Sequence, residues 1–140
     1  MLLHIVARGR IGRGPEAELV GRYLKRIPGP TRVTELPDRG GRIPPLTTPG
    51  VTILLDEKGA LLGSTAFAEK VGRWRDDGMR EARFLIGAAD GFTDTERGEA
   101  DLLLAFGAMT WPHLMARAML AEQLWRATSI LAGHPYHREG

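Results

Sequence analysis

The chain has 140 residues, no cysteine and a formal net charge of +2 at pH 7. Its length suits one domain over residues 1–140, and its apolar fraction of 43% and charged fraction of 26% are typical of globular proteins. The lack of cysteine excludes disulfides, a thiolate nucleophile and cysteine-containing zinc sites. No run approaches the roughly 20 apolar residues of a membrane span, and the first apolar run is too short for a signal peptide. We therefore expect a cytoplasmic protein with no membrane partner.

Charge is unevenly distributed along the chain. Residues 1–50 hold nine Lys or Arg against four Asp or Glu, a net charge of +5, and residues 51–140 hold ten against thirteen, a net charge of −3. A basic half suits a polyanionic partner, because neutralising phosphates releases counterions. On charge alone, a solvated arginine-rich surface is the simpler interpretation.

The first half of the chain predicts two strands around a helix, then a loop and a third strand. An apolar run predicts a strand over 2–7, and apolar residues at helical spacing predict a helix that begins at Pro15 and stops before Pro28. A second strand is expected over 31–36. Residues 37–50 are rich in Gly and Pro and include Arg39 and Arg42, which predicts a mobile, basic loop. Residues 51–55 predict a buried strand that ends at Asp56.

The second half continues the alternation. Ser64 is the expected N-cap of a helix that ends before Asp77, and a fourth strand is predicted over 82–86. Thr93 and Glu96 have the spacing of a capping box at the start of a short helix. A fifth strand is expected over 102–106, and a long helix over about 114–131 is ended by Gly133.

Alternating strands and helices predict an α/β fold with an open, mostly parallel sheet. Ligands of such sheets bind beyond the carboxyl ends of the strands. Three turn-rich segments follow predicted strands, at 55–59, 87–91 and 107–112, and their glycines allow a ligand to approach the backbone closely. None matches a dinucleotide or triphosphate motif, and any one of them alone is also an ordinary tight connection.

Histidines give no sign of a metal site. His4 lies in the first predicted strand and is expected to be structural, and the spacing of His113, His134 and His137 does not resemble a pair of metal ligands. The C-terminal tail combines an aromatic residue with basic ones, which could grip an unstacked RNA base. Fraying of a terminal segment is the alternative.

The long helix carries apolar residues on more than one face, including Met115, Leu124 and Trp125. Such a helix either packs against a second copy or forms the central core helix of a monomer.

Taken together, several segments of the chain resemble the RlmH family of the SPOUT class of methyltransferases in order and spacing. The resemblance is carried by residues 3–9, 23–26, 84–91, 109–113, 116–117, 121–127 and 134–138, and it covers nearly the whole chain. It implies an α/β fold with a C-terminal trefoil knot, a rare exception to unknotted topology. It also implies a homodimer that methylates the N3 nitrogen of a pseudouridine in the large-subunit ribosomal RNA of the assembled ribosome.

The resemblance further implies that S-adenosylmethionine binds in the knot, held largely by backbone groups, with no metal. The positions carried over as cofactor-binding are Leu55, Gly87, Ala88, Gly107, Ala108, Met109, Thr110, Trp111 and Pro112. Methyl transfer mainly requires alignment of donor and acceptor, and the N3 nitrogen must lose its proton. The expected catalytic residues are Arg126, Tyr136, His137 and Arg138, and the tail of one subunit is expected to complete the site of the other.

Two departures from the family pattern bear on binding. Ala88 stands where the family usually has a second glycine, which is expected to narrow the cofactor pocket by a methyl group. Residues 37–50 are shorter than the family norm and lack its usual helix. The alternatives are a catalytically silent ribosome-binding protein of the same fold and a methyltransferase of another RNA position.

Overall fold

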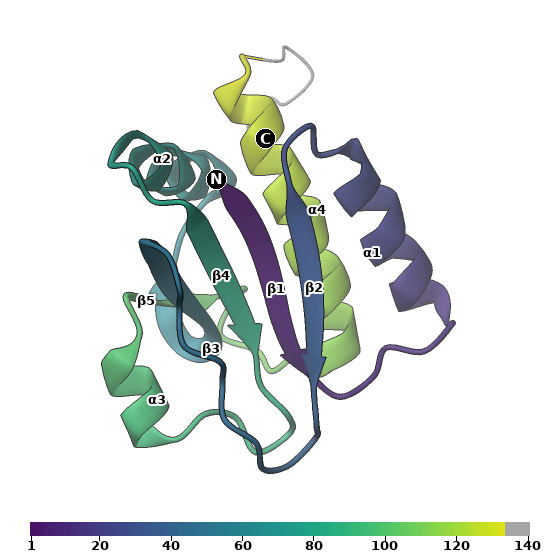
Figure 1. Cartoon of the computed structure of the whole chain (residues 1–140). Coiled ribbons are helices and arrows are strands. Elements are labelled where there is room, and N and C mark those ends of the chain that lie inside the picture. The colour runs from purple at the N-terminus through teal and green to yellow at the C-terminus, as the bar shows by residue number, and fades with distance from the viewer. Residues whose placement is uncertain (134–140) are drawn as a thin grey trace.

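The computed structural model describes residues 1–133, which form a parallel five-stranded sheet flanked by helices (Figure 1). The strands are β1 (Leu2–Arg8), β2 (Thr31–Leu36), β3 (Gly50–Leu61), β4 (Glu81–Ile86) and β5 (Leu102–Ala105), and the helices are α1 (Pro15–Arg26), α2 (Ser64–Asp76), α3 (Asp94–Glu99) and α4 (His113–Leu131). The sheet order is β2-β1-β4-β3-β5, and each neighbouring pair is parallel. The predicted α/β architecture is confirmed, and all carboxyl ends of the strands meet at one edge.

One face of the sheet packs against α1, α2 and α4. Alternate strand residues point to this side, and Ile5, Ile53 and Phe84 are completely buried there. Helix α4 lies between α1 and α2 and contributes Leu120 and Leu124, both also completely buried. These neighbours within the chain cover much of the apolar surface that the sequence shows on more than one side of this helix, whereas Met115 stays exposed.

The opposite face of the sheet carries a smaller apolar cluster and a polar half. Val6, Leu54 and Leu85 are buried here with Phe92, which follows β4. The polar half includes His4, whose ring nitrogens lie 3.0 Å from the Glu81 carboxylate and 2.7 Å from the Thr34 hydroxyl. The structural role expected for this histidine is therefore confirmed.

Strand β3 is longer than the sequence predicts. It pairs with β5 at Ile53–Leu55 and again, after a register shift, at Ala60 and Leu61. Residues 56–59 bulge out between the two stretches. Gly59 permits the second stretch, because a Cβ atom at this position would lie 2.6 Å from the backbone of Leu103 and Leu104. The polar run that suggests a strand end is in fact a bulge within a strand.

Two helix caps test the sequence predictions. The Thr93 hydroxyl accepts a hydrogen bond from the N–H of Glu96 at 3.1 Å, and the Glu96 carboxylate accepts one from the N–H of Thr93 at 2.8 Å, which confirms the capping box. Ser64 is not the N-cap of α2. Gly63 holds that position, and the Ser64 hydroxyl instead donates to the side chain of Gln123 on α4 at 2.8 Å. A hydrogen bond to another helix thus replaces the cap that the sequence predicts for Ser64.

A buried arginine ties α4 to the carboxyl ends of β1 and β2. The side chain of Arg117 is only 1% exposed, and it donates to the Glu35 carboxylate at 2.6 Å and to the backbone oxygen of Gly9 at 3.1 Å. The same Glu35 oxygen accepts from the N–H of Ile11 at 2.8 Å. The hydrogen bond from Arg117 holds the pKa of the Glu35 carboxyl below its ordinary value, although partial burial acts in the opposite direction.

Replacing Glu35 by glutamine should lower the free energy of unfolding by about 1–3 kcal/mol, because the Arg117 cation stays buried without its carboxylate. Adding Arg117→Met to the Glu35→Gln variant removes that cation and should recover part of the loss. Urea unfolding of the three chains measures both effects. A Glu35→Gln variant as stable as the parent chain would contradict this account.

Candidate cofactor site

Three loops at the carboxyl edge of the sheet enclose a cavity of about 710 Å³. They are the β3 bulge, the turn after β4 and the segment between β5 and α4, and the first turn of α4 closes the cavity. Its volume lies within the range of small-molecule and cofactor pockets. The lining residues are Leu55, Asp56, Glu57, Lys58, Gly87, Ala88, Ala89, Asp90, Gly91, Phe92, Arg97, Leu104, Ala105, Phe106, Gly107, Met109, Thr110, Trp111, Pro112, His113 and Ala116.

This cavity gathers almost all of the residues that the sequence analysis assigns to cofactor binding. Leu55, Gly87 and Ala88 line it, together with Gly107 and residues 109–112. Ala108 does not line it. Residues separated by more than fifty positions in the sequence therefore meet at one place.

Backbone conformation shapes the cavity wall. Gly107 has a φ of 116°, a region that residues with a Cβ atom avoid. At Gly87, a Cβ atom would lie 3.3 Å from the carbonyl group of Gly91, so the turn after β4 is tight. The turn is closed by the N–H of Gly91, which donates to the Ala88 oxygen at 2.9 Å. Such a wall presents backbone groups to a ligand with few side chains in the way.

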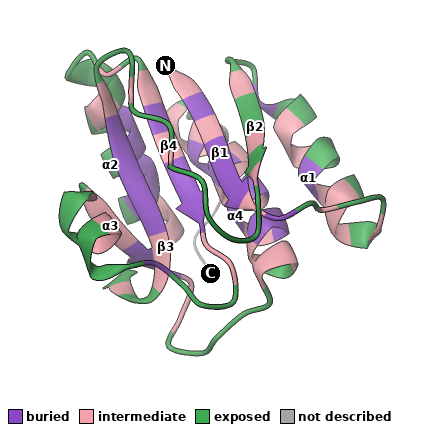
Figure 2. Ribbon diagram, turned by 60° about the horizontal axis from the view of Figure 1, so that its bottom comes forward, coloured by how far each residue is buried: buried purple, intermediate pink, exposed green. Residues whose placement is uncertain are grey.

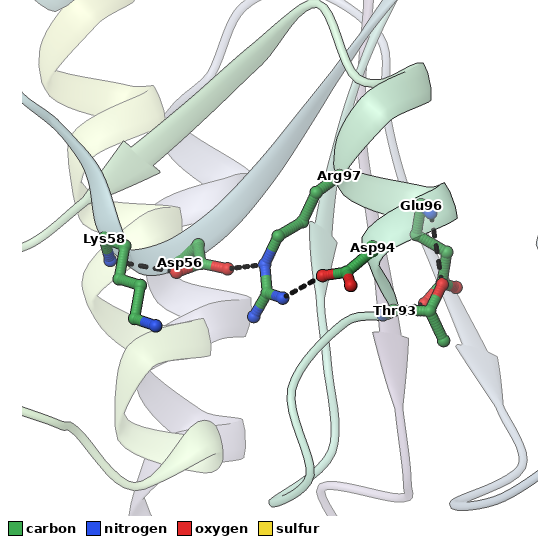
Figure 3. A network of polar contacts seen from close by, with 6 residues as sticks. All are labelled: Asp56, Lys58, Thr93, Asp94, Glu96 and Arg97. Carbon is green, nitrogen blue, oxygen red and sulfur yellow. Dashed lines mark hydrogen bonds and ion pairs between the residues drawn. The ribbon is translucent and has the colours of Figure 1, made fainter.

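An ion-pair network holds the β3 bulge against α3 (Figure 3). The Asp56 carboxylate accepts a hydrogen bond from Arg97 Nε at 2.7 Å and another from the N–H of Lys58 at 2.9 Å. Arg97 also lies 3.4 Å from the Asp94 carboxylate. Burial raises the pKa of Asp56, but the bonds and charges of Arg97 and Lys58 outweigh it, so the pKa lies below its ordinary value. The Arg97 guanidinium correspondingly has a raised pKa because it donates to Asp56.

The segment between β5 and α4 is fastened at two points. The Thr110 hydroxyl donates a short hydrogen bond to the Glu57 carboxylate on the β3 bulge. The indole N–H of Trp111 donates to the Phe106 oxygen at 3.2 Å. The Thr110–Glu57 hydrogen bond and the Asp56–Arg97 ion pair thus join the walls of the cavity, and the Trp111–Phe106 hydrogen bond holds the segment itself together.

The floor of the cavity holds a residue that the sequence analysis did not assign to the site. His113 begins α4, and its Nδ1 atom is buried without a hydrogen-bond partner among the described residues. Arg97 and Phe92 are further lining residues outside the prediction. Sequence could not identify them, because their place depends on how α3 and α4 return to the sheet.

Arg126, the one predicted catalytic residue that the structure describes, does not line this cavity. Arg126 lies on α4, thirteen positions after His113, which is roughly 20 Å along the helix axis. It is paired with Glu122, whose Oε1 lies 2.9 Å from Nε and 2.5 Å from Nη2. Tyr136, His137 and Arg138 lie outside the described residues.

Residues 1–133 contain no group of three or more His, Cys, Asp or Glu side chains arranged to hold a metal ion. Within the same range, no helix combines the length and apolar character that a membrane crossing requires.

The Asp56–Arg97 ion pair predicts a pH-dependent difference in stability. Because the pKa of Asp56 is lowered on folding, its contribution is complete above the ordinary value of 3.8 and is lost as the pH falls through the folded value. The parent chain should therefore have a higher Tm than Asp56→Asn at pH 7, and the difference should shrink towards zero in strong acid. Thermal unfolding, followed by circular dichroism between about pH 2.5 and pH 7, measures this difference in Tm.

The matched control is Asp76→Asn. Asp76 pairs with Arg75 at 3.1 Å, but both side chains are more than half exposed, so little change in Tm is expected. A Tm difference for Asp56→Asn that stays constant with pH would count against this account.

Comparison with known proteins agrees with the geometry. A family model described as predicted SPOUT methyltransferase matches residues 1–137. The curated protein "Ribosomal RNA large subunit methyltransferase H" of Rhizorhabdus wittichii is 78% identical over 140 residues and 100% of both chains. Proteins of the same name are 61% identical in Zymomonas mobilis, over 100% of both chains, and 44% identical in Roseobacter denitrificans, over 99% of both.

A solved structure described as a probable methylase family protein from Haemophilus influenzae has the same fold. The TM-score is 0.63 at 13% sequence identity, and the match covers 99% of this chain and 70% of that chain. A likeness at this identity bears on the fold only. The match of the family model over nearly the whole length and the high identity of the relatives show that the chain belongs to the SPOUT methyltransferase family, among proteins named ribosomal RNA large subunit methyltransferase H.

Proposed function

We propose that this chain is a single methyltransferase domain that uses S-adenosylmethionine to methylate the N3 nitrogen of a pseudouridine in large-subunit ribosomal RNA of the assembled ribosome. The observation that carries the proposal is the cavity at the carboxyl edge of the sheet, which gathers eight of the nine residues assigned to this cofactor in advance. The names of the relatives support ribosomal RNA as the substrate. Action on the ribosome would place the protein in the cytoplasm.

The residues of the cavity fit the proposed cofactor. Leu55, Phe106 and Met109 offer apolar surface for an adenosine ring, and the turn of residues 87–91 offers backbone groups. Carboxylates of Glu57 and Asp90 lie in the lining and would attract the positive sulfonium group. When bound, S-adenosylmethionine supplies an activated methyl group, so the chain itself has to align donor and acceptor.

The route of the chain supports the proposed C-terminal trefoil knot. After β5, at one end of the sheet order, the chain passes the turn of residues 87–91 and then enters α4, between α1 and α2. Residues from three separate crossings of the carboxyl edge therefore surround one cavity. We expect the cofactor to stabilise this crossing.

The length of α4 favours a homodimer in which each tail completes the partner's site. The helix has 19 residues and is about 28 Å long, with the cavity at its N-terminal end. Arg138 lies five residues beyond Gly133, so even an extended chain carries it at most about 18 Å from that position. Tyr136 and His137 reach less far. The backbone of the tail thus falls short of the helix length that separates it from the cavity of its own chain, and this favours completion of the site by the tail of a second copy.

Within such a site, Arg126 and the tail residues would act on the substrate. A cation beside the ring stabilises the anion formed when the N3 nitrogen loses its proton. We assign that role to Arg126 and Arg138, with His137 as the proton acceptor and Tyr136 stacked on the base. The chemistry needs no metal in this scheme.

The decisive experiment uses purified protein, S-adenosylmethionine and ribosomes from a strain that lacks the gene. Mass spectrometry of the digested RNA should show one N3-methylated pseudouridine, and reverse transcription should stop there because the methyl group blocks base pairing. Methylation of another nucleotide would contradict the assigned position. Failure to bind S-adenosylmethionine in calorimetry would favour a catalytically silent ribosome-binding protein.

Replacing His137 and Arg138 together by alanine should abolish methylation while leaving the fold and cofactor affinity unchanged. The reason is that the tail contributes to the acceptor side of the site and not to the cofactor cavity. Single-turnover methylation, circular dichroism and calorimetry give the three readouts. Full activity in the double variant would remove the tail from the mechanism.

Mixing this double variant with a cavity variant, Gly87→Val, tests whether the tail acts on the partner's site. If it does, mixed dimers contain one site with an intact cavity and an intact tail, and activity should return to about a quarter of the parent level. If each tail served its own chain, the mixture would stay inactive. Each variant alone, at the same concentration, is the control.

A further inference from the structure

A second cavity, of about 980 Å³, lies on the face of the sheet opposite the main helix layer. Its floor is formed by β3 and β4 through Thr52, Leu54, Arg83 and Leu85. One wall is the loop after β2, and Figure 2 shows this exposed loop running across the front of the sheet. The other wall is the segment from the end of β4 through α3 to Asp101. We call this cavity the sheet-face groove.

The two walls of the sheet-face groove carry opposite charges. Arg39 and Arg42 lie on the loop wall, where Asp38 is the single lining carboxylate, and Arg8 lines the groove from the end of β1. All charged lining residues of the α3 wall are acidic. They are Asp90, Glu96, Glu99 and Asp101.

Some of these charged side chains make hydrogen bonds within the chain, and others are exposed and available to contact a ligand. Arg8 donates to the backbone oxygens of Pro37, Gly40 and Gly41, at 3.1, 2.6 and 3.3 Å, and so fixes the loop to the end of β1. Glu96 belongs to the capping box, and Asp101 accepts from the N–H of Thr52 at 2.8 Å. By contrast, the side chains of Arg39, Arg42, Asp90 and Glu99 are exposed and make no hydrogen bond or ion pair within residues 1–133.

The groove adjoins the cofactor cavity. Ala88, Asp90 and Gly91 line both cavities, so a single turn separates them. The loop wall is also held from below, because Arg83 donates a short hydrogen bond to the Pro44 oxygen and another to the Thr52 hydroxyl at 2.8 Å. A ligand in the groove would therefore lie between anchored walls, one turn away from the proposed cofactor site.

We propose that the sheet-face groove binds a single-stranded segment of the substrate RNA, with its phosphates along Arg39 and Arg42 and its base edges towards the carboxylates of the α3 wall. This inference rests on the proposed function. Arginine binds phosphate through paired hydrogen bonds, and carboxylates accept from the N–H groups of bases but repel phosphates. One wall of the groove carries arginines and the other carries carboxylates. A bound strand therefore places its phosphates towards the first wall and its base edges towards the second. Proteins read RNA mainly in unpaired segments, whose base edges are accessible.

The test variant carries Arg39→Ala and Arg42→Ala together in one chain. The matched control carries Lys70→Ala and Arg73→Ala together. The control removes the same charge from exposed side chains of α2, far from the groove in the sequence and in the fold. Binding to ribosomes is measured by co-sedimentation without cofactor over a range of salt concentrations. The groove variant should bind about tenfold more weakly, and the slope of log affinity against log salt should fall by about 1.4, the value for two phosphate contacts of a single strand. Equal losses in both variants, or none, would overturn the proposal.

Glu99→Ala tests the orientation of the strand. Glu99 lines the groove but not the cofactor cavity. If base edges face this wall, the variant should bind ribosomes more weakly. Tighter binding would mean that phosphates lie there, and it would overturn the assignment of the walls.

Two controls separate this inference from the proposed function and from dimerisation. Calorimetry with S-adenosylmethionine should give the same Kd for all these variants, and a parent chain that binds ribosomes but methylates nothing would contradict the proposed function alone. Sedimentation velocity should give the same oligomeric state for every variant. Loss of the oligomer on replacing Arg39 and Arg42 would identify the groove as a contact between copies and overturn the proposal.

Discussion

The buried cation of Arg117 is the constraint on which the arrangement of the functional edge depends. A charge that is 1% exposed must keep its partners, and these partners come from the ends of β1 and β2. The first turn of α4 is thereby set beneath the carboxyl edge, where His113 and Ala116 become the cavity floor. Glu35 lies two residues before the loop that forms one wall of the sheet-face groove. One ion pair thus positions elements of both cavities.

The cofactor cavity is built mostly from backbone and from contacts between loops. Glycines at 59, 87 and 107 permit approaches or dihedral angles that a side chain would oppose, and the Asp56–Arg97 pair and the Thr110–Glu57 hydrogen bond hold the loops together. Such a site suits a reaction in which alignment is the main requirement. The groups proposed to handle the proton belong to another part of the chain, so binding and proton transfer are divided between the two ends of α4.

Periodicity and turn chemistry predicted the five strands, the four helices and the capping box, because these depend on local preference and on burial of one face. The meeting of the three loops that line the first cavity was predicted as well, since parallel strands bring their carboxyl ends together and the family pattern marks the same loops. The bulge at residues 56–59 could not be predicted, because it depends on Gly59 meeting the backbone of β5, some 44 residues later in the chain. Nor could the sequence show that Ser64 bonds to Gln123 instead of capping its helix, or that Arg97 reaches Asp56. Each of these is a long-range contact chosen by packing.

The turn shared by the two cavities couples whatever occupies them. Ala88, Asp90 and Gly91 form part of both walls, and the turn is closed by one internal backbone hydrogen bond. A ligand that immobilises this turn from one side removes conformational freedom that a ligand on the other side would otherwise have to suppress. With both cavities occupied as proposed, cooperativity between nucleic acid and nucleoside would depend on these three residues. Thermodynamic linkage would make it mutual: each occupant would raise the affinity for the other by the same factor.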